Sequence, residues 1–429
     1  MTDPVSFFRD VASQHPRCFW LDGGGAREWS GRRSIIGWLE DDDVSLTWSA
    51  ARREVRAHAG GSSTVVGDDL FEVLEERIGA GEQWFGYFGH ATRTDLPAPP
   101  DPSLPDAVWM RPRAVRVFEH APLQESPLER GLPRDAAVAT AQPRQSPPTP
   151  VTREVPEAYA AAFAAVQEHL HAGNSYEVNL THRLTRESDL DPVTAYLRLR
   201  ELNPAPYSGF LQHDVVDARA WLLSSSPERY ALITPDRYLE TKPIKGTTPR
   251  GTTAEEDDGH RDRLARDPKT RAENLMIVDL LRNDLSLVCE VGSVEVPALM
   301  QVETYASVHQ LVSTVRGHLR DDVTTIGALR ALFPAGSMTG APKLRTMQII
   351  EEVESSPRGV YAGAFGWISG DGPADLGVVI RSLTTDGGGT WTLGTGGGIT
   401  VKSEVAEEWA ESEWKAERLL RVFDRPEPL

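Results

Sequence analysis

Several features that define large classes of protein are scarce or missing in this sequence of 429 residues. The two cysteines, Cys18 and Cys289, fit neither a Cys-x-x-Cys nor a Cys/His zinc spacing, so we expect both to be buried and reduced. No window holds about 18 consecutive apolar residues, which argues against a membrane-spanning helix. The N-terminus lacks a basic region followed by an apolar one, so we expect no signal peptide and predict a cytoplasmic protein.

Positive charge is also in short supply. Lysine and arginine number 45 against 63 aspartates and glutamates, which gives a formal net charge of −18, and no basic run occurs. We therefore expect no binding to nucleic acid, because contacts with phosphates need a basic surface. An anionic substrate would require local lysines and arginines or a bound metal ion, since the protein as a whole would repel it.

Two glycine-rich stretches fail the tests for nucleotide binding. Residues 394–399 carry Ile399 where the dinucleotide fingerprint needs a glycine, and Pro342 separates Gly340 from Lys343 where a Walker loop would join them. The first stretch suits the close approach of a carboxylate to bare backbone N–H groups. The second could present hydroxyls and N–H groups to an anion at the start of a helix.

The chain changes character along its length. Residues 1–120 alternate strand-like runs with turns, and residues 34–39 and 44–48 are predicted to be neighbouring strands around an acidic turn. Residues 121–150 are rich in proline and read as a mobile linker or excursion. Residues 151–429 look like one continuous unit.

Within that unit, strands and helices alternate. Helices are predicted at residues 156–172, from Asp267-Pro268 onwards, and at residues 405–423. The charged stretch at 252–266 is predicted to be mobile, and residues 375–383 to be one strand. This alternation indicates a mixed α/β or α+β unit with large sheets.

The stretch Pro243-Ile244-Lys245-Gly246-Thr247 places a lysine between a stiff approach and a turn. A lysine held in this way can act as a nucleophile if its pKa is lowered. Taken alone, the stretch is more typical of a surface loop with solvated lysines.

Carboxylates occur at helical spacing in two places. Glu273 lies in an otherwise apolar turn, and Glu408 and Glu411 share one helix face with Lys415. Such carboxylates either face solvent or hold a hard cation such as Mg²⁺. His309, Arg381 and Tyr361 are single polar residues on apolar stretches, and each taken alone is more typical of a core or edge residue.

Taken together, the pieces resemble the chorismate-utilising enzyme family, in the family's order and spacing over about residues 155–420. Residues 1–120 match more loosely, through residues 31–37 and 84–89. The segments that carry the resemblance are Ser226-Pro227-Glu228-Arg229, Pro243-Ile244-Lys245-Gly246-Thr247, residues 271–284, residues 333–343, Gly396 to Ile399, and Glu408-Trp409-Ala410-Glu411 with Lys415-Ala416.

The resemblance implies a large two-lobed α+β unit, with β-sheets packed as a sandwich and helices outside, as in anthranilate synthase component I. It makes residues 1–120 the N-terminal part of that fold and residues 151–429 the chorismate-binding catalytic domain. Within the family, Lys245 is typical of the members that aminate chorismate at C4, because the anthranilate-forming members carry alanine there. The isochorismate- and salicylate-forming members have a lysine where Glu177 stands here.

The resemblance also implies roles for individual residues. Lys245 would be the nucleophile and Glu228 the general acid, while His309 and Thr339 would orient the ring and the leaving group. Lys245 must then have a lowered pKa, which burial and a nearby Mg²⁺ would favour, and Glu228 must lie in a dry place. Mg²⁺ would be held by Glu273, Glu408 and Glu411, and the carboxylates of chorismate by Tyr361, Arg381, Lys415 and the backbone at Gly396 and Gly398.

Ammonia has to reach such an enzyme from elsewhere. The sequence has no glutamine amidotransferase signature with a nucleophilic cysteine between glycines, so a separate glutaminase subunit is the implied partner. The expected product, 4-amino-4-deoxychorismate, would supply 4-aminobenzoate for folate or for secondary metabolism. Two alternatives stay open, namely anthranilate synthase component I and a non-catalytic paralogue.

Overall fold

The structure is a computed structural model that describes residues 3–23, 33–120, 154–305 and 308–424. The predicted linker at residues 121–150 lies outside the described residues. The described strands form two large antiparallel sheets.

The first sheet contains nine described strands and joins distant parts of the chain. Strands from the first 120 residues form one end of it, and two strands from residues 177–187 and 340–341 form the other. In order the strands are β17 (Gly340–Ala341), β9 (Glu177–Glu187), β21 (Thr390–Ile399), β20 (Ser382–Thr385), β11 (Ala220–Ser226), β10 (Tyr207–His213), β1 (Arg17–Asp22), β2 (Arg33–Trp38) and β8 (Val115–Glu119).

The second sheet contains twelve described strands and is built in the same way. Strand β15 (Glu295–Thr304) pairs with β16 off the main path. The remaining strands, in order, are β14 (Ile244–Pro249), β16 (Val308–His318), β13 (Tyr238–Lys242), β12 (Arg229–Ile233), β19 (Ala374–Val378), β18 (Ala364–Ser369), β6 (Gln83–Phe88), β7 (Ala107–Met110), β3 (Ser45–Ser49), β4 (Glu54–Ala59) and β5 (Ser62–Gly67).

The two sheets pack face to face through an apolar core. Phe19 of β1 stacks on Phe85 of β6 with ring centroids 4.1 Å apart, and Leu211, Leu222 and Phe365 join the same cluster. Each strand alternates its side chains between the two faces of its sheet, so this apolar cluster is formed by the inner face of each sheet. The expected sandwich is therefore confirmed.

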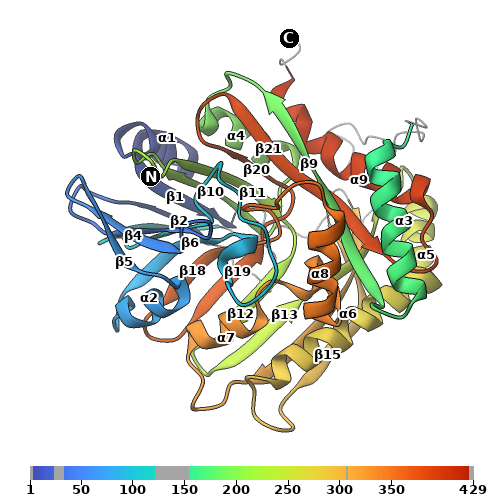
Figure 1. The fold of residues 1–429 in the computed structure, drawn as a ribbon. Coiled ribbons are helices and arrows are strands. Elements are labelled where there is room, and N and C mark those ends of the chain that lie inside the picture. The colour runs from blue at the N-terminus through green and yellow to red at the C-terminus, as the bar shows by residue number, and fades with distance from the viewer. Residues whose placement is uncertain (1–2, 24–32, 121–153, 306–307, 425–429) are drawn as a thin grey trace.

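Helices cover the outer faces of the sandwich (Figure 1). Helices α1 (Pro4–Gln14) and α4 (Pro192–Leu202) pack on the nine-stranded sheet, and α2 (Leu70–Arg77), α6 (Pro268–Ser286) and α7 (Thr325–Leu332) pack on the twelve-stranded sheet. Near β9 and β21 lie α3 (Glu157–His171), α8 (Lys343–Val353) and α9 (Val405–Leu420). None of the helices in the described ranges is long and apolar enough to cross a membrane.

Two local predictions were wrong, and one helix was missed. Residues 34–39 and 44–48 are strands, but β2 belongs to one sheet and β3 to the other, so they are not neighbours. The charged stretch at 252–266 contains helix α5 (Ala254–Arg266), which Thr253 caps by accepting a hydrogen bond from the N–H of Glu256. The predicted strand at 375–383 is broken between β19 and β20, because the chain crosses there from one sheet to the other.

Candidate active site

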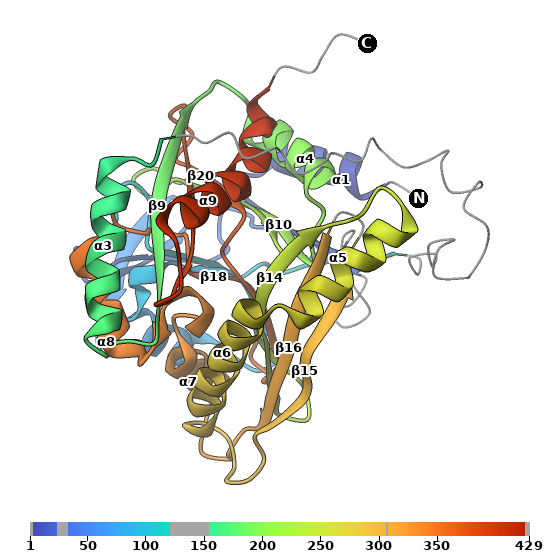
Figure 2. The same ribbon diagram turned by 90° about the vertical axis from the view of Figure 1, so that its right-hand side faces the viewer.

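A cavity of about 600 Å³ opens between β14, β21, α6 and α9. Figure 2 labels β14, α6 and α9, and Figure 1 labels β21. It is lined by ten of the twelve residues predicted for the site. They come from elements far apart in the sequence, which the two sheets bring together. The ten residues are Glu228, Lys245, Glu273, Tyr361, Arg381, Gly396, Gly398, Glu408, Glu411 and Lys415.

Lys245 enters this cavity from an irregular place in β14. The pairing of β14 with β16 shifts between Ile244 and Thr247, and such a bulge re-aims a side chain. Gly246 has φ of +86°, and a Cβ at that position would lie 2.3 Å from the side chain of Thr270. The glycine that follows Lys245 in the motif is therefore required by the backbone.

The Lys245 ammonium forms a buried ion pair with Glu177, which the sequence analysis had not given a role. Lys245 Nζ donates a hydrogen bond to Glu177 Oε1. Burial acts to lower the pKa of Lys245, but the charges of Glu177 and Glu273 outweigh it, so the pKa is raised. The prediction of a lowered pKa is wrong for the protein alone, because burial is not the only influence on the amine.

Glu228 lies in the dry place that the sequence predicts. The residue is 5% exposed. Burial raises the pKa of its carboxyl group to about 7, although a hydrogen bond with Ser337 and the charge of Lys245 act in the opposite direction. A carboxyl group of this kind holds its proton near neutral pH and can donate it to a leaving group.

Three carboxylates face the same cavity. Burial raises the pKa of Glu273 to about 7, and Glu273 Oε1 is a buried atom without a hydrogen-bond partner. Lys269 Nζ lies 2.8 Å from Glu408 Oε1, and Lys415 Nζ lies 2.8 Å from Glu411 Oε1. Each of the last two carboxylates is thus already neutralised by a lysine.

These carboxylates suit Mg²⁺ in kind. They offer hard oxygen donors, and the orphaned oxygen of Glu273 is one that a cation would satisfy. Among the described residues, no group of three His, Cys, Asp or Glu side chains is yet arranged to hold a metal ion. Lys269 pairs with Glu408 and Lys415 pairs with Glu411 instead. Metal binding therefore requires the two lysines to release these carboxylates or to share them with the ion.

Arg381 and Tyr361 also line the cavity. Arg381 lies where the chain crosses between the sheets, with φ of +50°, and its guanidinium lies 5.8 Å from the centre of the Trp414 ring. Burial lowers the pKa of Arg381 to about 10, so it stays charged at neutral pH. Tyr361 packs on Gly394, where a Cβ would lie 2.2 Å from the tyrosine ring. The guanidinium of Arg381 can therefore receive a carboxylate of an anion.

Comparison with known proteins places this cavity in a family. Residues 16–421 match the family described as chorismate binding enzyme. The chain belongs to the chorismate binding enzyme family. The resemblance predicted from the motifs is thereby confirmed.

Relatives within the family differ in what their names say they do. The chain is 37% identical over 462 residues to an aminodeoxychorismate synthase of Streptomyces pristinaespiralis, covering 98% of this chain and 64% of the relative. It is 42% identical over 269 residues to aminodeoxychorismate synthase component 1 of Escherichia coli (strain K12), covering 63% of this chain and 58% of the relative. The chain thus spans less than two thirds of the length of these two relatives.

A solved structure supports the fold. Anthranilate synthase component I from Streptococcus pneumoniae TIGR4 superposes with a TM-score of 0.72 at 25% identity, covering 91% of this chain and 92% of that one. The predicted architecture of the anthranilate synthase component I type is confirmed.

Two predicted residues of the chorismate-binding site do not line the cavity. His309 is buried, with Nδ1 2.9 Å from Thr304 Oγ1 and Nε2 3.1 Å from Asp257 Oδ1. Thr339 is fully buried, and its hydroxyl lies 3.3 Å from the carbonyl oxygen of Gly336. The orienting roles of His309 and Thr339 stay predictions.

Other lining residues carried no role in the sequence analysis. Lys269, Asn179, Ser337 and Gln310 all line the cavity. Lys269 could have been found, because it lies four residues before Glu273 and therefore on the same helix face. The pairing of Glu177 with Lys245 had no such signal, since the two residues come from different sheets.

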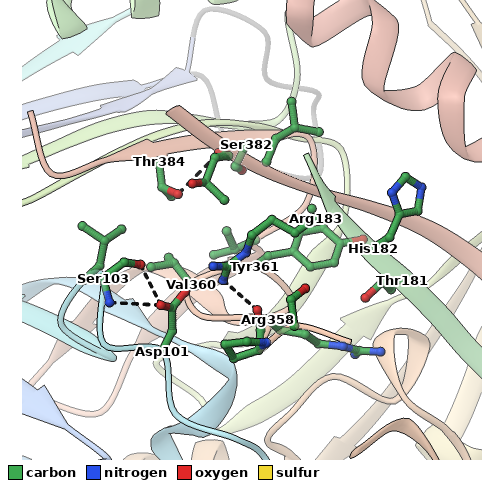
Figure 3. Close-up of a pocket in the computed structure, with 17 residues that line it drawn as sticks. Asp101, Ser103, Thr181, His182, Arg183, Arg358, Val360, Tyr361, Ser382 and Thr384 are labelled. Atoms are coloured by element: carbon green, nitrogen blue, oxygen red, sulfur yellow. Dashed lines mark hydrogen bonds and ion pairs between the residues drawn. The ribbon is translucent and has the colours of Figure 1, made fainter. Parts of the chain in front are cut away.

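A second, much smaller cavity of about 20 Å³ shares Tyr361 and Gly394 with the first (Figure 3). Arg183 pairs with Asp101 at this cavity, and Asp101 also accepts a hydrogen bond of 2.7 Å from the hydroxyl of Ser103. Its volume suits one water molecule. The larger cavity is therefore the one that can hold a substrate.

Proposed function

We propose that this chain aminates chorismate at C4 with ammonia to give 4-amino-4-deoxychorismate, through a covalent bond between Lys245 and the ring. One observation carries the proposal. Lys245 and the dry carboxyl of Glu228 line the same cavity of about 600 Å³, which further carboxylates and cationic side chains also line. The chorismate binding family and the names of the two relatives supply the substrate class.

The cavity can orient an anionic substrate. Arg381 and Lys415 supply positive charge, and Gly396 and Gly398 line the cavity with backbone that no side chain of their own covers. When bound to Glu273, Glu408 and Glu411, Mg²⁺ would neutralise the ring carboxylate that this acidic protein would otherwise repel. His309 and Thr339 keep their proposed orienting roles only if they move toward the cavity.

The first half of the reaction displaces the hydroxyl group. Lys245 attacks C2 as a neutral amine, the C2–N bond forms, both double bonds of the ring shift, and the C4–O bond breaks. Glu228 gives its proton to the departing hydroxyl, which leaves as water. Lys245 has to lose a proton before it attacks, and Glu177 is the carboxylate that already accepts a hydrogen bond from it.

The second half restores the lysine. Ammonia adds at C4, both double bonds shift back, and the C2–N bond breaks. The proton that the new ammonium group loses restores the carboxyl group of Glu228. Two successive displacements leave the new amine on the face that the hydroxyl occupied. The nitrogen of Lys245 returns to the cavity as a free amine.

The source of ammonia and the use of the product form part of the proposal. The name of the Escherichia coli relative, component 1, implies a second component, and we propose a glutamine amidotransferase subunit that delivers ammonia. The product would supply 4-aminobenzoate after a separate lyase step, in folate or secondary metabolism. We also keep the predicted cytoplasmic location, which cell fractionation would test.

The test of this function is Lys245→Ala assayed with chorismate, Mg²⁺ and ammonium, with products separated by liquid chromatography and mass spectrometry. We expect wild type to form aminodeoxychorismate and the variant to lose at least about a thousandfold in rate, the effect of removing an essential nucleophile. Lys402→Ala is the matched control, because Lys402 is exposed and does not line the cavity. Undiminished product formation by Lys245→Ala would sink the covalent mechanism.

The second candidate is an anthranilate synthase, which the similarity to the Streptococcus pneumoniae structure favours. The same assay separates the two, because anthranilate and pyruvate would replace the non-aromatic aminated product. A non-catalytic paralogue would show no Mg²⁺-dependent turnover of chorismate with ammonium. The presence of both Lys245 and Glu228 in the cavity speaks against it.

A further inference from the structure

Lys269 occupies an unusual place among the acidic residues of the cavity. It lies in the first turn of α6, lines the cavity, and its Nζ donates a hydrogen bond of 2.8 Å to Glu408 Oε1 of α9. The charges of Glu273 and Glu411 also act on its ammonium group. One lysine therefore faces all three carboxylates expected to hold the metal.

The carboxylates around Lys269 are only partly paired with cations or hydrogen-bond donors. Glu408 is 3% exposed and has its ammonium partner, whereas Glu273 Oε1 is buried without a hydrogen-bond partner. Three clustered carboxylates without cations would repel one another strongly in a buried site. Lys269 and Lys415 relieve this repulsion only in part, because they pair with Glu408 and Glu411 and leave Glu273 Oε1 without a partner.

We propose that Lys269 is a built-in counter-ion of the metal site, which holds Glu408 in the metal-free protein and releases it when Mg²⁺ binds. The inference rests on the proposed function, which supplies the metal. The lysine side chain is 37% exposed, and its four-carbon stem can swing into the open cavity. A divalent ion and an ammonium group repel each other when they share these carboxylates, so Lys269 must weaken metal binding.

The same contact gives the metal-free protein a benefit. It links α6 to α9 at the cavity. It also gives the buried Glu408 carboxylate a partner, and a buried carboxylate without one would destabilise the fold. Lys269 thus lowers the affinity for Mg²⁺, and in return it holds Glu408 in place when no metal ion is bound. It is a positioning residue, because it acts on the metal through Glu408.

Removing the charge of Lys269 tests this inference without relying on turnover. We expect Lys269→Met to bind Mg²⁺ about tenfold more tightly than wild type in isothermal titration calorimetry, the scale of one unit charge about 6 Å from a divalent ion at the dielectric constant of water. In EDTA the same variant should unfold at a lower temperature than wild type, and added Mg²⁺ should raise its unfolding temperature by more. Lys269→Arg keeps the charge and should bind Mg²⁺ like wild type.

Lys402→Met is the matched control, since it removes the same charge from an exposed residue outside the cavity. Unchanged or weaker Mg²⁺ binding by Lys269→Met, with normal binding by wild type, would overturn the role of Lys269 alone. Absence of Mg²⁺ binding by wild type itself would overturn the proposed metal site and this inference together. If Lys269→Met does not fold, Mg²⁺ binding by Lys269→Gln decides the matter in the same way.

Discussion

At the scale of single residues, the cavity raises the pKa of both proposed catalytic groups, for opposite reasons. Burial raises the pKa of Glu228 and outweighs a hydrogen bond with Ser337 and the charge of Lys245, which act to lower it. Lys245 is equally buried, but the charges of Glu177 and Glu273 overcome that burial and raise its pKa too. The general acid is therefore ready in the protein alone, whereas the nucleophile needs a change in the charges around it.

The proton on Glu228 can be detected through stability. The unfolded carboxyl group ionises near 4.5 and the folded one near 7, so the folded state binds the extra proton and wild type loses stability as pH rises between these values. The side chain of Glu228→Gln does not titrate. The difference between the unfolding free energy of the variant and that of wild type, measured in urea, should therefore change by about 3 kcal/mol in favour of the variant from pH 4 to pH 8. Measurements in EDTA exclude any effect of metal. Glu228→Asp keeps a carboxyl group and should retain part of the trend, and a pH-independent difference for the Gln variant would contradict a buried, protonated Glu228.

The family's motifs were enough to predict most residues of the cavity but not their pairings. Glu228, Lys245 and Arg381 were each ambiguous alone, and their order along the chain selected the family. The ion pair between Lys245 and Glu177 could not be predicted, because it depends on how closely β14 and β9 approach across two sheets. That contact reverses the expected pKa shift of Lys245.

At the scale of elements, helix ends were predictable and strand partners were not. Asp267 and Pro268 mark the start of α6, where the Asp267 side chain accepts a hydrogen bond of 2.7 Å from the N–H of Thr270. Helix α5 was missed because it buries only Leu264 and so lacks an apolar stripe. The crossing between β19 and β20 was missed because periodicity along one strand does not show a change of sheet.

Two glycines of β21 are expected to serve different purposes, one in packing and one in catalysis. A Cβ at Gly396 would lie 2.2 Å from the carbonyl oxygen of Leu180, and one at Gly398 would lie 2.0 Å from Glu177 Oε1. We expect Gly396→Ala to lower the unfolding free energy by about 1–3 kcal/mol, because strand β9 cannot move aside. Gly398→Ala should lower chorismate turnover at least about tenfold, because it displaces the partner of the Lys245 amine.

Urea unfolding and the ammonium-dependent assay measure the two effects on both variants. Gly79→Ala is the control, since its Cβ would meet Glu82 at an ordinary 3.5 Å. A large loss of stability in Gly398→Ala with unchanged turnover per folded molecule would show that this glycine serves packing instead.

At the scale of the whole molecule, the residues before and after the predicted linker share both sheets. Strand β1 pairs with β10, and β6 pairs with β18, so each sheet is completed by strands from residues 17–119. The stacked pair of Phe19 and Phe85 lies in the core between the sheets. Composition could suggest a boundary at 121–150, but it could not show that the strands on either side interleave.

This sharing predicts that residues 154–429 will not fold when expressed alone. Without the first part of the chain, β10 and β18 would become open edges, and Leu211 and Phe365 would lose the apolar layer that covers them. The full chain should unfold in urea in one transition, with the same midpoint by tryptophan fluorescence and far-ultraviolet circular dichroism. Residues 1–120 supplied as a separate chain should restore folding of the fragment. A fragment that unfolds cooperatively on its own would show instead that the catalytic part is an independent domain.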